Sequence, residues 1–472
     1  MEHAKESNKS VILPSLKKLT LKVGSFAIAE EIIKNQEELL QQIENDNCLL
    51  TLTIHHEAII NHKEETISLK YVVNAGSQSI IKEINFMGLT SVSETYLKKA
   101  TPLKPNTCFQ RTKILKARKK LQSTGLFVST TPDIPDEVND KGEVPIIFNL
   151  KERKHRSIKT GLSYGNDLGA GVNLGWEHRN FFSNAEKVSI NTFINKKEQL
   201  GKISYVEPFF MRDDQKLKAS LSGENTLHRA FSNKEGKLFV GIERKLREKL
   251  DAGVGGKITL SESKEKNHKR EKFFLFSTPT FLRLNKRDNI LNPQKGYFLF
   301  GQTEPFIDID GDSKPFLKNT IRARYYFKAH ENLVVAFRGT IGSILGDNAS
   351  KIPPTERYFA GGNSSIRGYA FQSAGPLDEN RLPIGGKSIV ETTAELRFNI
   401  IGNIGLAIFT DSGSVYRKHL PNSENKFFHS VGFGLRYDTG FGPIRADIAF
   451  PTKRRKRIDD PFQFYFGIGQ SF

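Results

Sequence analysis

The stretch FQFYFGIGQSF, which runs from Phe462 to Phe472, alternates apolar and polar side chains. Its apolar parity is broken only by Gln470 and consists of Phe462, Phe464, Phe466, Ile468 and Phe472. Successive side chains of a β-strand point to opposite faces of the sheet, so this strand would have one apolar and one polar face. Such a strand fits the wall of a barrel in a bilayer, because a closed barrel leaves no unpaired edge in lipid. A strand of a soluble sandwich can show the same alternation, and this stretch alone does not decide between the two folds.

The same pattern recurs through most of the chain. From about Ser157 onward, runs of roughly 9 to 14 residues with period-two patterning are separated by turn-rich or charged segments. There are about sixteen such runs, at about 20 residues for each strand with its connection, and a membrane-crossing strand needs about 9–11. We therefore predict an all-β transmembrane barrel of about 16 antiparallel strands over residues 154–472.

The composition agrees with strands rather than long helices. The chain holds 35 Phe and 38 Gly but only 3 Met. No stretch approaches the roughly 18 apolar residues of a transmembrane helix, which excludes a helical membrane protein. The mean hydropathy of −0.44 leaves a barrel possible, because lumen-facing polar residues lower the average.

Two smaller α+β units are predicted before the barrel. Residues 1–77 hold a helix with apolar spacings of three and four residues, followed by the strands CLLTLTIHHEAII and ETISLKYVVNAG, a hairpin under the helix. Residues 78–153 give the complete order strand, helix, helix, strand, strand. The first unit lacks a clear opening strand and is interpreted as a partial copy of the second.

The N-terminus and the cysteines carry two further expectations. MEHAKESNKS has no apolar core and no small-residue cleavage site, so it is not a secretory signal, and we expect this N-terminus to be incomplete. Cys48 and Cys108 fall in different predicted units, and we expect two unreactive free thiols rather than a disulfide.

One loop of the predicted barrel is much longer than the others. If both ends of the barrel are periplasmic, odd strands run outward, and the segment from about Leu345 to Gly386, between strands 11 and 12, is extracellular. Long segments without regular structure are usually functional or disordered. This one contains RYFAGGNSSIRGYA, from Arg357 to Ala370.

That motif, in that loop, resembles the BamA/TamA family of outer-membrane assembly proteins, the bacterial surface antigen family. Further similarities are WEHRNFF after the second strand, YVEP after the fourth, GPIRADIAFP, and the ending FQFYFGIGQSF. The unit at 78–153 resembles a POTRA (polypeptide-transport-associated) domain. Within the family, the junction LKERKHRSIKTGLSYG, the ending YFGIGQSF and the short POTRA array are most similar to TamA-like members, outer-membrane subunits of the translocation and assembly module.

The resemblance implies a function and partners. We expect an outer-membrane translocation and assembly factor, with its POTRA domains in the periplasm, that inserts β-barrel proteins or autotransporters. The implied partners are a TamB-like inner-membrane-anchored protein, client outer-membrane proteins and the lipid bilayer. The alternatives are a BamA-type general insertase, a two-partner secretion transporter and a passive porin. TamA-like proteins commonly carry three POTRA domains, and this sequence shows at most two.

Nothing in the sequence indicates an enzyme. The 11 histidines lack metal-ligand spacing, and there is no nucleophile elbow and no phosphate loop. We expect no catalytic residue, no metal and no cofactor.

The residues expected to matter form an anchor for the long loop. Alternation in strand 12 places Glu395 in the lumen, where it can meet Arg367 of the loop. Asp411 in strand 13 can face inward as well. The resemblance implies that the loop arginine docks against acids at these two strand positions. Gly368 and Tyr369 complete the motif, with Tyr369 as a packed aromatic wedge, whereas Arg357 has no predicted partner.

A second set of residues marks a lateral seam between the first strand, Ser157 to Gly165, and the last. Glycines contribute no side chain to strand pairing, and these two strands contain Gly161, Gly165, Gly467 and Gly469, with Phe472 at the end. A seam that opens would offer a strand edge to a client by β-augmentation. The alternative is that the glycines only relieve crowding in the barrel.

The net charge of +19 fits nucleic acid, anionic lipid or an acidic client. The basic run KRRKR, Lys453 to Arg457, lies in the last extracellular loop of the predicted topology. It either contacts lipopolysaccharide phosphates or is solvated. Nucleic acid is not expected, because no aromatic residues interleave with the charge.

Overall fold

The computed structural model describes residues 11–14, 19, 21–165, 169–266, 268–311, 313–422, 427–439, 442–468, 470 and 472. The N-terminal residues 1–10 and Gly469, about which the sequence makes predictions, lie outside this description. The chain divides into two compact units. Unit 1 comprises Met1–His155 with Arg179–Ala185, and unit 2 comprises Arg156–His178 with Glu186–Phe472. Among the described residues, no helix is long and apolar enough to cross a membrane.

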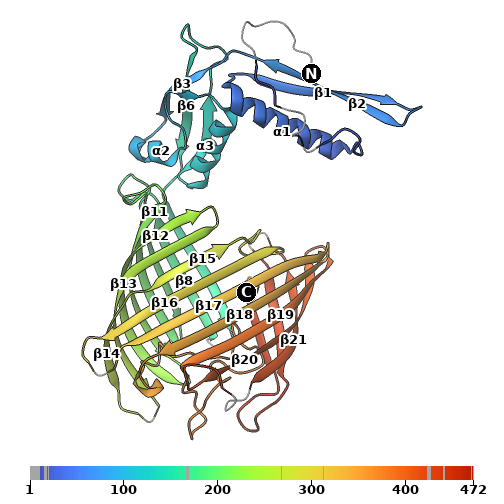
Figure 1. The fold of residues 1–472 in the computed structure, drawn as a ribbon. Helices are drawn as coiled ribbons and strands as arrows, with labels where there is room; N and C mark the ends of the chain where they lie inside the picture. Colours follow the sequence, from blue (N-terminus) through green and yellow to red (C-terminus); the bar gives the residue numbers. More distant parts are fainter. Residues whose placement is uncertain are drawn as a thin grey trace. The chain divides into compact units, whose positions relative to one another are not determined.

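The first part of unit 1 is a helix on a hairpin. Helix α1 (Ala29–Asn47) packs on the antiparallel strands β1 (Leu52–Asn61) and β2 (Thr66–Ala75), as the sequence predicts (Figure 1). Leu39 and Ile43, four residues apart on one face of the helix, are fully buried against Leu49 and Ile54.

The second part of unit 1 is a small α+β sheet. Its strands are ordered β4-β3-β6-β5, with β3 (Ile80–Met87), β4 (Thr107–Cys108), β5 (Phe127–Asp133) and β6 (Glu143–Glu152). Helices α2 (Glu94–Ala100) and α3 (Arg111–Ser123) supply the buried residues Leu97, Ile114 and Leu121. Strands β3 and β6 are parallel neighbours, and Phe86 pairs with Phe148. The predicted order of strand, helix, helix, strand, strand is present, with the short strand β4 added between the two helices.

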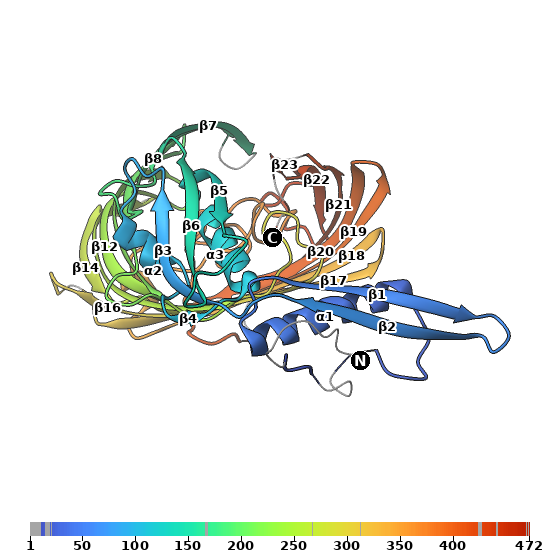
Figure 2. The ribbon, with the colours of Figure 1, turned by 90° about the horizontal axis from the view of Figure 1, so that it is seen from above.

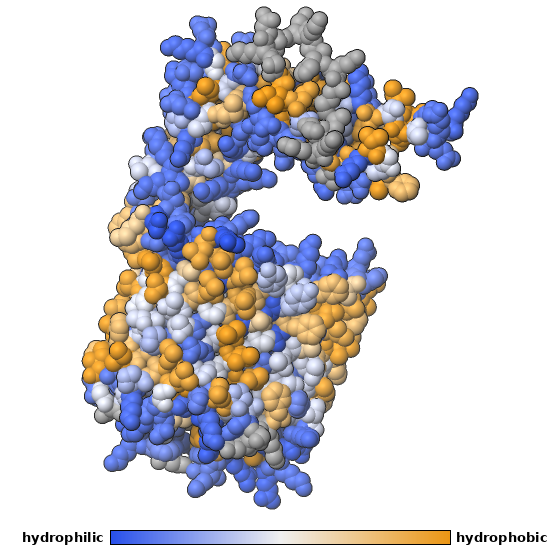
Figure 3. Space-filling model, viewed as in Figure 1, coloured by the Kyte–Doolittle hydropathy of each residue, from blue (hydrophilic) through white to orange (hydrophobic). Residues whose placement is uncertain are grey.

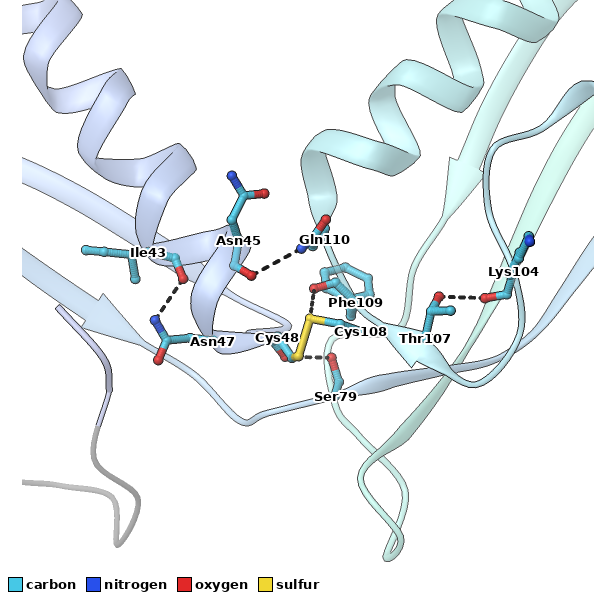
Figure 4. Close-up of a disulfide and its surroundings, with 10 residues drawn as sticks. All are labelled: Ile43, Asn45, Asn47, Cys48, Ser79, Lys104, Thr107, Cys108, Phe109 and Gln110. Carbon is cyan, nitrogen blue, oxygen red and sulfur yellow. Dashed lines mark hydrogen bonds between the residues drawn. A yellow bond between two sulfur atoms is a disulfide. The ribbon is translucent and has the colours of Figure 1, made fainter. Parts of the chain in front are cut away.

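A disulfide joins the two parts of unit 1, and the expectation of free thiols was wrong. Cys48 and Cys108 are bonded, with their Cα atoms 4.9 Å apart (Figure 4). Both flank the connection from β2 to β3: Ser79 N donates to Cys48 O at 2.7 Å, and Cys108 pairs with Ile80. The spacing of the cysteines in the sequence does not reveal this, because only the fold brings both against one segment.

Polar contacts beside the disulfide hold the same junction. Gln110 Nε2 donates to Asn45 O at 3.3 Å, and Thr112 N donates to Glu44 Oε1 at 2.8 Å. The carboxylate of Glu44 thus lies at the N-terminal end of α3, where the helix dipole favours an anion. The disulfide, these two hydrogen bonds and the charge of Glu44 at the helix end thus connect the two parts of unit 1.

Glu152, at the end of β6, organises the loop before α2. Its carboxylate accepts hydrogen bonds from the backbone N–H groups of Thr90, Ser91 and Val92 at 2.8 to 2.9 Å. Burial alone would raise the pKa of Glu152, but these amides and the Ser91 hydroxyl hold the pKa well below its usual range. The loop in turn binds residues 179–185 within unit 1, because Asn180 Nδ2 donates to Ser91 O at 3.0 Å.

Unit 2 is a closed antiparallel barrel (Figure 2). Within the described residues it has seventeen strand segments, of which β14 and β15 both pair with β13 on one side and β16 on the other. These two segments are halves of one strand, so the ring has sixteen strands, and β23 closes it against β7. The predicted fold class is confirmed. The segments are β7 (Arg156–Gly165), β8 (Gly169–His178), β9 (Lys187–Asn195), β10 (Glu198–Pro208), β11 (Gln215–Leu227), β12 (Phe231–Arg247), β13 (Leu250–Glu265), β14 (Glu271–Ser277), β15 (Thr280–Asn285), β16 (Gly296–Asp308), β17 (Phe316–His330), β18 (Leu333–Leu345), β19 (Ser388–Ile401), β20 (Ile404–Tyr416), β21 (Phe428–Tyr437), β22 (Ile444–Pro451) and β23 (Gln463–Ile468).

The wall alternates as a barrel in lipid requires. In β21 every second residue is buried, including Ser430 and Arg436, while Phe433 and Leu435 between them are exposed. Figure 3 shows apolar side chains spread over the wall and hydrophilic side chains gathered at the lower end of the barrel in that view. The apolar face is outside and the polar face inside.

We predict that replacing both cysteines by serine destabilises unit 1 by about 4 kcal/mol, the chain-entropy value for a loop of this length. The disulfide closes a loop of 60 residues. Hydrogen exchange of β1 to β4 in the full protein should lose protection to the same extent in the double variant and in the reduced wild type. Reduction should leave the double variant unchanged. Equal protection of oxidised and reduced wild type would contradict the prediction.

Candidate functional site

The connection between β18 and β19, residues 346–387, folds into the barrel lumen. Its side chains Ile352, Ile366 and Ala374 are fully buried in a cluster with wall residues such as Ile344 and Val415. A hydrophobic core inside a barrel is otherwise expected only where side chains of the wall fill the interior. Here the loop supplies much of that filling.

Arg367 at the centre of this loop is surrounded by carboxylates. It is 1% exposed, and Glu395 of β19, Asp411 of β20 and Asp447 of β22 are each at most 1% exposed. Arg367 Nε and Nη2 donate to the two oxygens of Asp411 at 2.8 and 3.2 Å. Nη1 donates to Glu395 Oε2 at 3.0 Å and to Asp447 Oδ2 at 3.3 Å. The fork with Asp411 is the bidentate geometry that arginine makes best.

The alternation of the strands positions these acids. Residues that face each other across an antiparallel ladder lie on one face, and Asp411 is paired with Thr393 while Glu395 is paired with Phe409. The Phe409 ring lies flat beneath the guanidinium, 3.3 Å from its centroid to Arg367 Cζ. A Cβ on Gly432 of β21 would overlap that ring, so the glycine makes room for it.

Three arginines of the barrel wall also bind the acids around Arg367. Arg397 Nε donates to Glu395 Oε1 at 2.8 Å, Arg445 Nη1 donates to Asp447 Oδ2 at 2.7 Å, and Arg436 also binds Asp447. We name the four arginines Arg367, Arg397, Arg436 and Arg445, with the acids Glu395, Asp411 and Asp447, the anchor network. Each acid has at least one arginine partner, as buried charges require.

Gly368 and Tyr369 hold the loop backbone against the wall. Gly368 has φ +96. A Cβ there would lie 3.0 Å from Ser430 Cβ and 3.2 Å from backbone atoms of Phe450 and Pro451 at the end of β22. Only glycine fits this close approach without strain. The Tyr369 hydroxyl donates to His429 O at 3.1 Å and to Lys453 O at 3.2 Å, and its ring packs edge-on against Phe428.

Two other arginines shape the loop itself. Arg357 donates to Ile352 O at 2.9 Å and to Ile384 O at 3.2 Å, and it forms an ion pair with Glu265 at 2.8 Å. Arg338 of β18 holds the carbonyl oxygens of Ser364 and Ser365, directly before the anchor residues. The loop is therefore bound at several points along its length.

Sequence reasoning found part of this site. It placed Arg367 with Glu395 and Asp411, and the structure brings these three together. It missed Asp447, Arg436, Arg445 and the partners of Arg357. Asp447 could have been found, because Arg445 and Asp447 share the inward parity of GPIRADIAFP.

In the basic run KRRKR, one arginine is bound to the long loop and the other four side chains are exposed. Arg455 Nε donates to Asp459 Oδ2 at 2.8 Å, and Arg455 Nη2 donates to Ser373 O of the long loop at 2.8 Å. It thus ties the β22–β23 connection to the loop in the lumen. The side chains of Lys453, Arg454, Lys456 and Arg457 are exposed.

The strands on either side of the seam are shorter than the longest strands of the wall. Within the described residues β23 has 6 residues and β7 has 10, whereas β12 has 17. The outward side chains Ile158 and Leu162 of β7 are 80% and 82% exposed, against 46% for Leu238 in the middle of β12. The outer face of β7 is thus poorly covered by its neighbours. Gly161 and Gly467 share the parity of the lumen-facing side chains on their strands, and Gly165 ends β7.

Phe472 does not extend the lipid-facing aromatic row, which is a correction to the parity argument. It is 7% exposed and stacks on Tyr326 of β17, with ring centroids 6.2 Å apart. The guanidinium carbons of Arg397 and Arg338 lie 5.2 and 5.5 Å from its ring centroid. The ring of Phe472 therefore does not follow the outward parity of Phe464 and Phe466, because contacts with these cations and with Tyr326 hold it in the lumen.

We predict that Arg367→Ala releases the loop from the lumen, because the three acids lose the cation between them and a broken buried ion pair costs about 3–5 kcal/mol. Limited proteolysis within residues 346–387 should accelerate strongly. Arg367→Lys keeps the positive charge but loses the bidentate contact, so its rate of proteolysis should lie between those of the wild type and Arg367→Ala. The matched control is Arg381→Ala, an exposed arginine of the same loop. Equal proteolysis of the Arg367→Ala and Arg381→Ala variants would refute the anchor.

Comparison with known proteins agrees with this architecture. The profile of the Omp85 superfamily domain matches residues 180–472, and the POTRA profile, described as a surface antigen variable number repeat, matches residues 79–153. A solved structure of Haemophilus ducreyi BamA lacking POTRA domains 1–3 superposes with a TM-score of 0.77 at 20% identity, covering 94% of each chain. CdiB from Acinetobacter baumannii gives a TM-score of 0.56 at 14% identity, covering 93% of this chain and 81% of CdiB. These structural likenesses establish the fold.

Curated relatives include proteins named outer membrane protein assembly factor BamA. The one from Neisseria meningitidis serogroup B is 20% identical over 97% of this chain and 64% of its own length. The one from Neorickettsia risticii is 24% identical over 81% of this chain and 54% of its own length. The chain thus spans between half and two thirds of these relatives. Together with the structural likeness and the POTRA match, this similarity confirms the predicted outer-membrane location of the barrel. With the superfamily profile covering more than half of its residues, the chain belongs to the Omp85 superfamily.

Proposed function

We propose that this chain is an outer-membrane assembly factor of the BamA type, which inserts client β-barrel proteins through the seam between β7 and β23. The observation that carries the proposal is Arg367, fully buried between carboxylates of β19, β20 and β22. This anchor ties the long loop to β22, the neighbour of the closing strand β23. The names of the curated relatives support the same role.

The seam is the proposed site of action. Among the described residues the closing strand β23 has six, which offer fewer ladder hydrogen bonds than the strands of 13 to 17 residues elsewhere in the ring. An open strand edge in lipid costs several kcal/mol for each unsatisfied backbone group, so opening is favoured only when a client strand replaces the lost partner. The edge of β7 would pair with that client by β-augmentation.

The location of a disulfide is consistent with this role. Disulfides form and persist in oxidising compartments such as the bacterial periplasm. Cys48 and Cys108 are bonded within unit 1, which contains the POTRA match. We propose that unit 1 is periplasmic and receives clients before they reach the barrel.

A TamA-like role is the second candidate. It rests on the junction LKERKHRSIKTGLSYG and the ending YFGIGQSF, and it would add a TamB-like inner-membrane-anchored partner and a narrower set of clients, such as autotransporters. The BamA-type role is favoured because the curated relatives carry that name.

We expect depletion of the protein, followed by quantitative proteomics of the outer membrane, to lower most β-barrel proteins together. A BamA-type factor serves barrels in general, whereas a TamA-like factor would lower a small subset. Complementation with the wild-type chain should restore the levels, and complementation with Arg381→Ala should do so equally. Unchanged levels of every barrel protein and autotransporter would exclude both roles.

The seam has its own test. A photo-crosslinking amino acid at Leu162, whose side chain is 82% exposed on the outer face of β7, should capture client barrel proteins during their assembly. The matched control is the same probe at Val240 of β12, which also faces outward but is 47% exposed and far along the ring. Capture at Val240 as efficient as at Leu162 would argue against insertion at β7.

A further inference from the structure

A second group of arginines in the lumen lacks carboxylate partners. Arg324 of β17 is paired directly with Arg338 of β18, and both face inward. Arg322 lies two residues along the same face of β17, and Arg287 lies at the turn before β16. We name Arg287, Arg322, Arg324 and Arg338 the free arginine cluster. Within the residues that the structure describes, none of the four forms an ion pair.

The cluster contrasts with the anchor network in the same lumen. Each arginine of the anchor network contacts Glu395, Asp411 or Asp447. Arg324, in contrast, experiences the positive charges of Arg287, Arg322 and Arg338. Like charges directly opposite each other across a ladder are destabilising. A bound anion would therefore relieve the repulsion between these arginines of the wall.

Neighbouring side chains fix the guanidinium groups of the cluster in positions that suit a planar anion. The guanidinium carbons of Arg287 and Arg324 lie 4.9 and 5.4 Å from the centre of the Phe298 ring, which holds both side chains in place. Arg338 donates to Ser365 O at 2.6 Å and to Thr393 Oγ1 at 2.9 Å, which fixes its guanidinium, while its Nε–H is buried without a partner. Arg322 is exposed to the lumen. Guanidinium groups fixed in this way favour bidentate carboxylates.

One acid lies nearby and is engaged elsewhere. Glu391 of β19 is 7% exposed, and its carboxylate accepts a hydrogen bond from Ser365 of the long loop. It is close enough for the charges of Arg322 and Arg338 to act on it. A single carboxylate bound to the loop leaves three of the four positive charges in the cluster uncompensated.

We propose that the free arginine cluster binds an acidic segment of a polypeptide through its carboxylates. The cluster lies on the polar inner wall, where the surrounding charge favours the carboxylates of a polypeptide over the acyl chains of a lipid. The identity of the polypeptide as a client rests on the proposed function, whereas the binding of carboxylates does not. The segment would contact Arg322 and Arg324 first, because Arg338 is already held by the loop.

The test compares two luminal arginines that carry the same charge. Arg324→Gln removes a cation from the free cluster. Arg283→Gln is the matched control, because Arg283 faces the same lumen but is paired with Glu243 at 2.9 Å and Asp251 at 3.0 Å. In the full-length protein in nanodiscs, without ligand, Arg324→Gln should raise the melting temperature by relieving repulsion. Arg283→Gln should lower it by leaving two acids without their cation.

Binding is then measured with hexaglutamate, and hexaglutamine serves as the uncharged probe. We expect hexaglutamate to bind the wild type with a Kd that rises about tenfold in Arg324→Gln, as expected for a charge-assisted contact, and stays unchanged in Arg283→Gln. Equal binding of hexaglutamine, or an equal loss in both variants, would overturn the proposal. So would displacement of hexaglutamate by equimolar phosphate or by phosphatidylglycerol, since either would indicate a phosphate site. None of these measurements involves client assembly, so their failure is distinguishable from failure of the proposed function.

Discussion

A guanidinium taken out of water must keep its carboxylates, and this constraint at Arg367 governs the C-terminal half of the barrel. The acids that meet it come from three strands, and each is there because its position has inward parity. Shifting one of these strands by a single residue would turn its acid toward lipid and leave Arg367 short of a partner. The anchor therefore fixes the register of β19, β20 and β22 as well as the place of the loop. Gly368 belongs to the same constraint, because a side chain there would push the arginine away from the wall.

The sequence predicted the fold well because a barrel strand records its two environments residue by residue. Alternation predicts the strands and places Glu395 and Asp411 in the lumen from the sequence alone, as the structure has them. The helix and hairpin of unit 1 followed from spacing in the same way. Local pattern is sufficient wherever the environment of a residue is set by its own strand or helix.

The features that the sequence did not predict depend on segments far apart in the chain. The disulfide forms because one short connection is paired with Cys48 on one side and with Cys108 on the other, a coincidence that spacing does not record. Asp447 was overlooked because the family resemblance pointed to two acids, although its parity with Arg445 was readable. Phe472 lies on the opposite face from the predicted one, because tertiary contacts with Tyr326 and Arg397 decide its place rather than the alternation of β23.

The anchor network also makes the ring mechanically uneven. Its charged contacts tie β19 to β22 together and, through the loop, to Arg338 of β18. Of the strands next to β7, β23 contributes hydrogen bonds of Tyr465 with Gly368 N and Tyr369 O rather than a charge, and the outer face of β7 itself is sparsely covered. The buried ion pairs of the anchor network thus lie on the arc from β19 to β22. On the proposed function, that arc keeps its register while the seam opens, and we expect β7 to be the strand that moves.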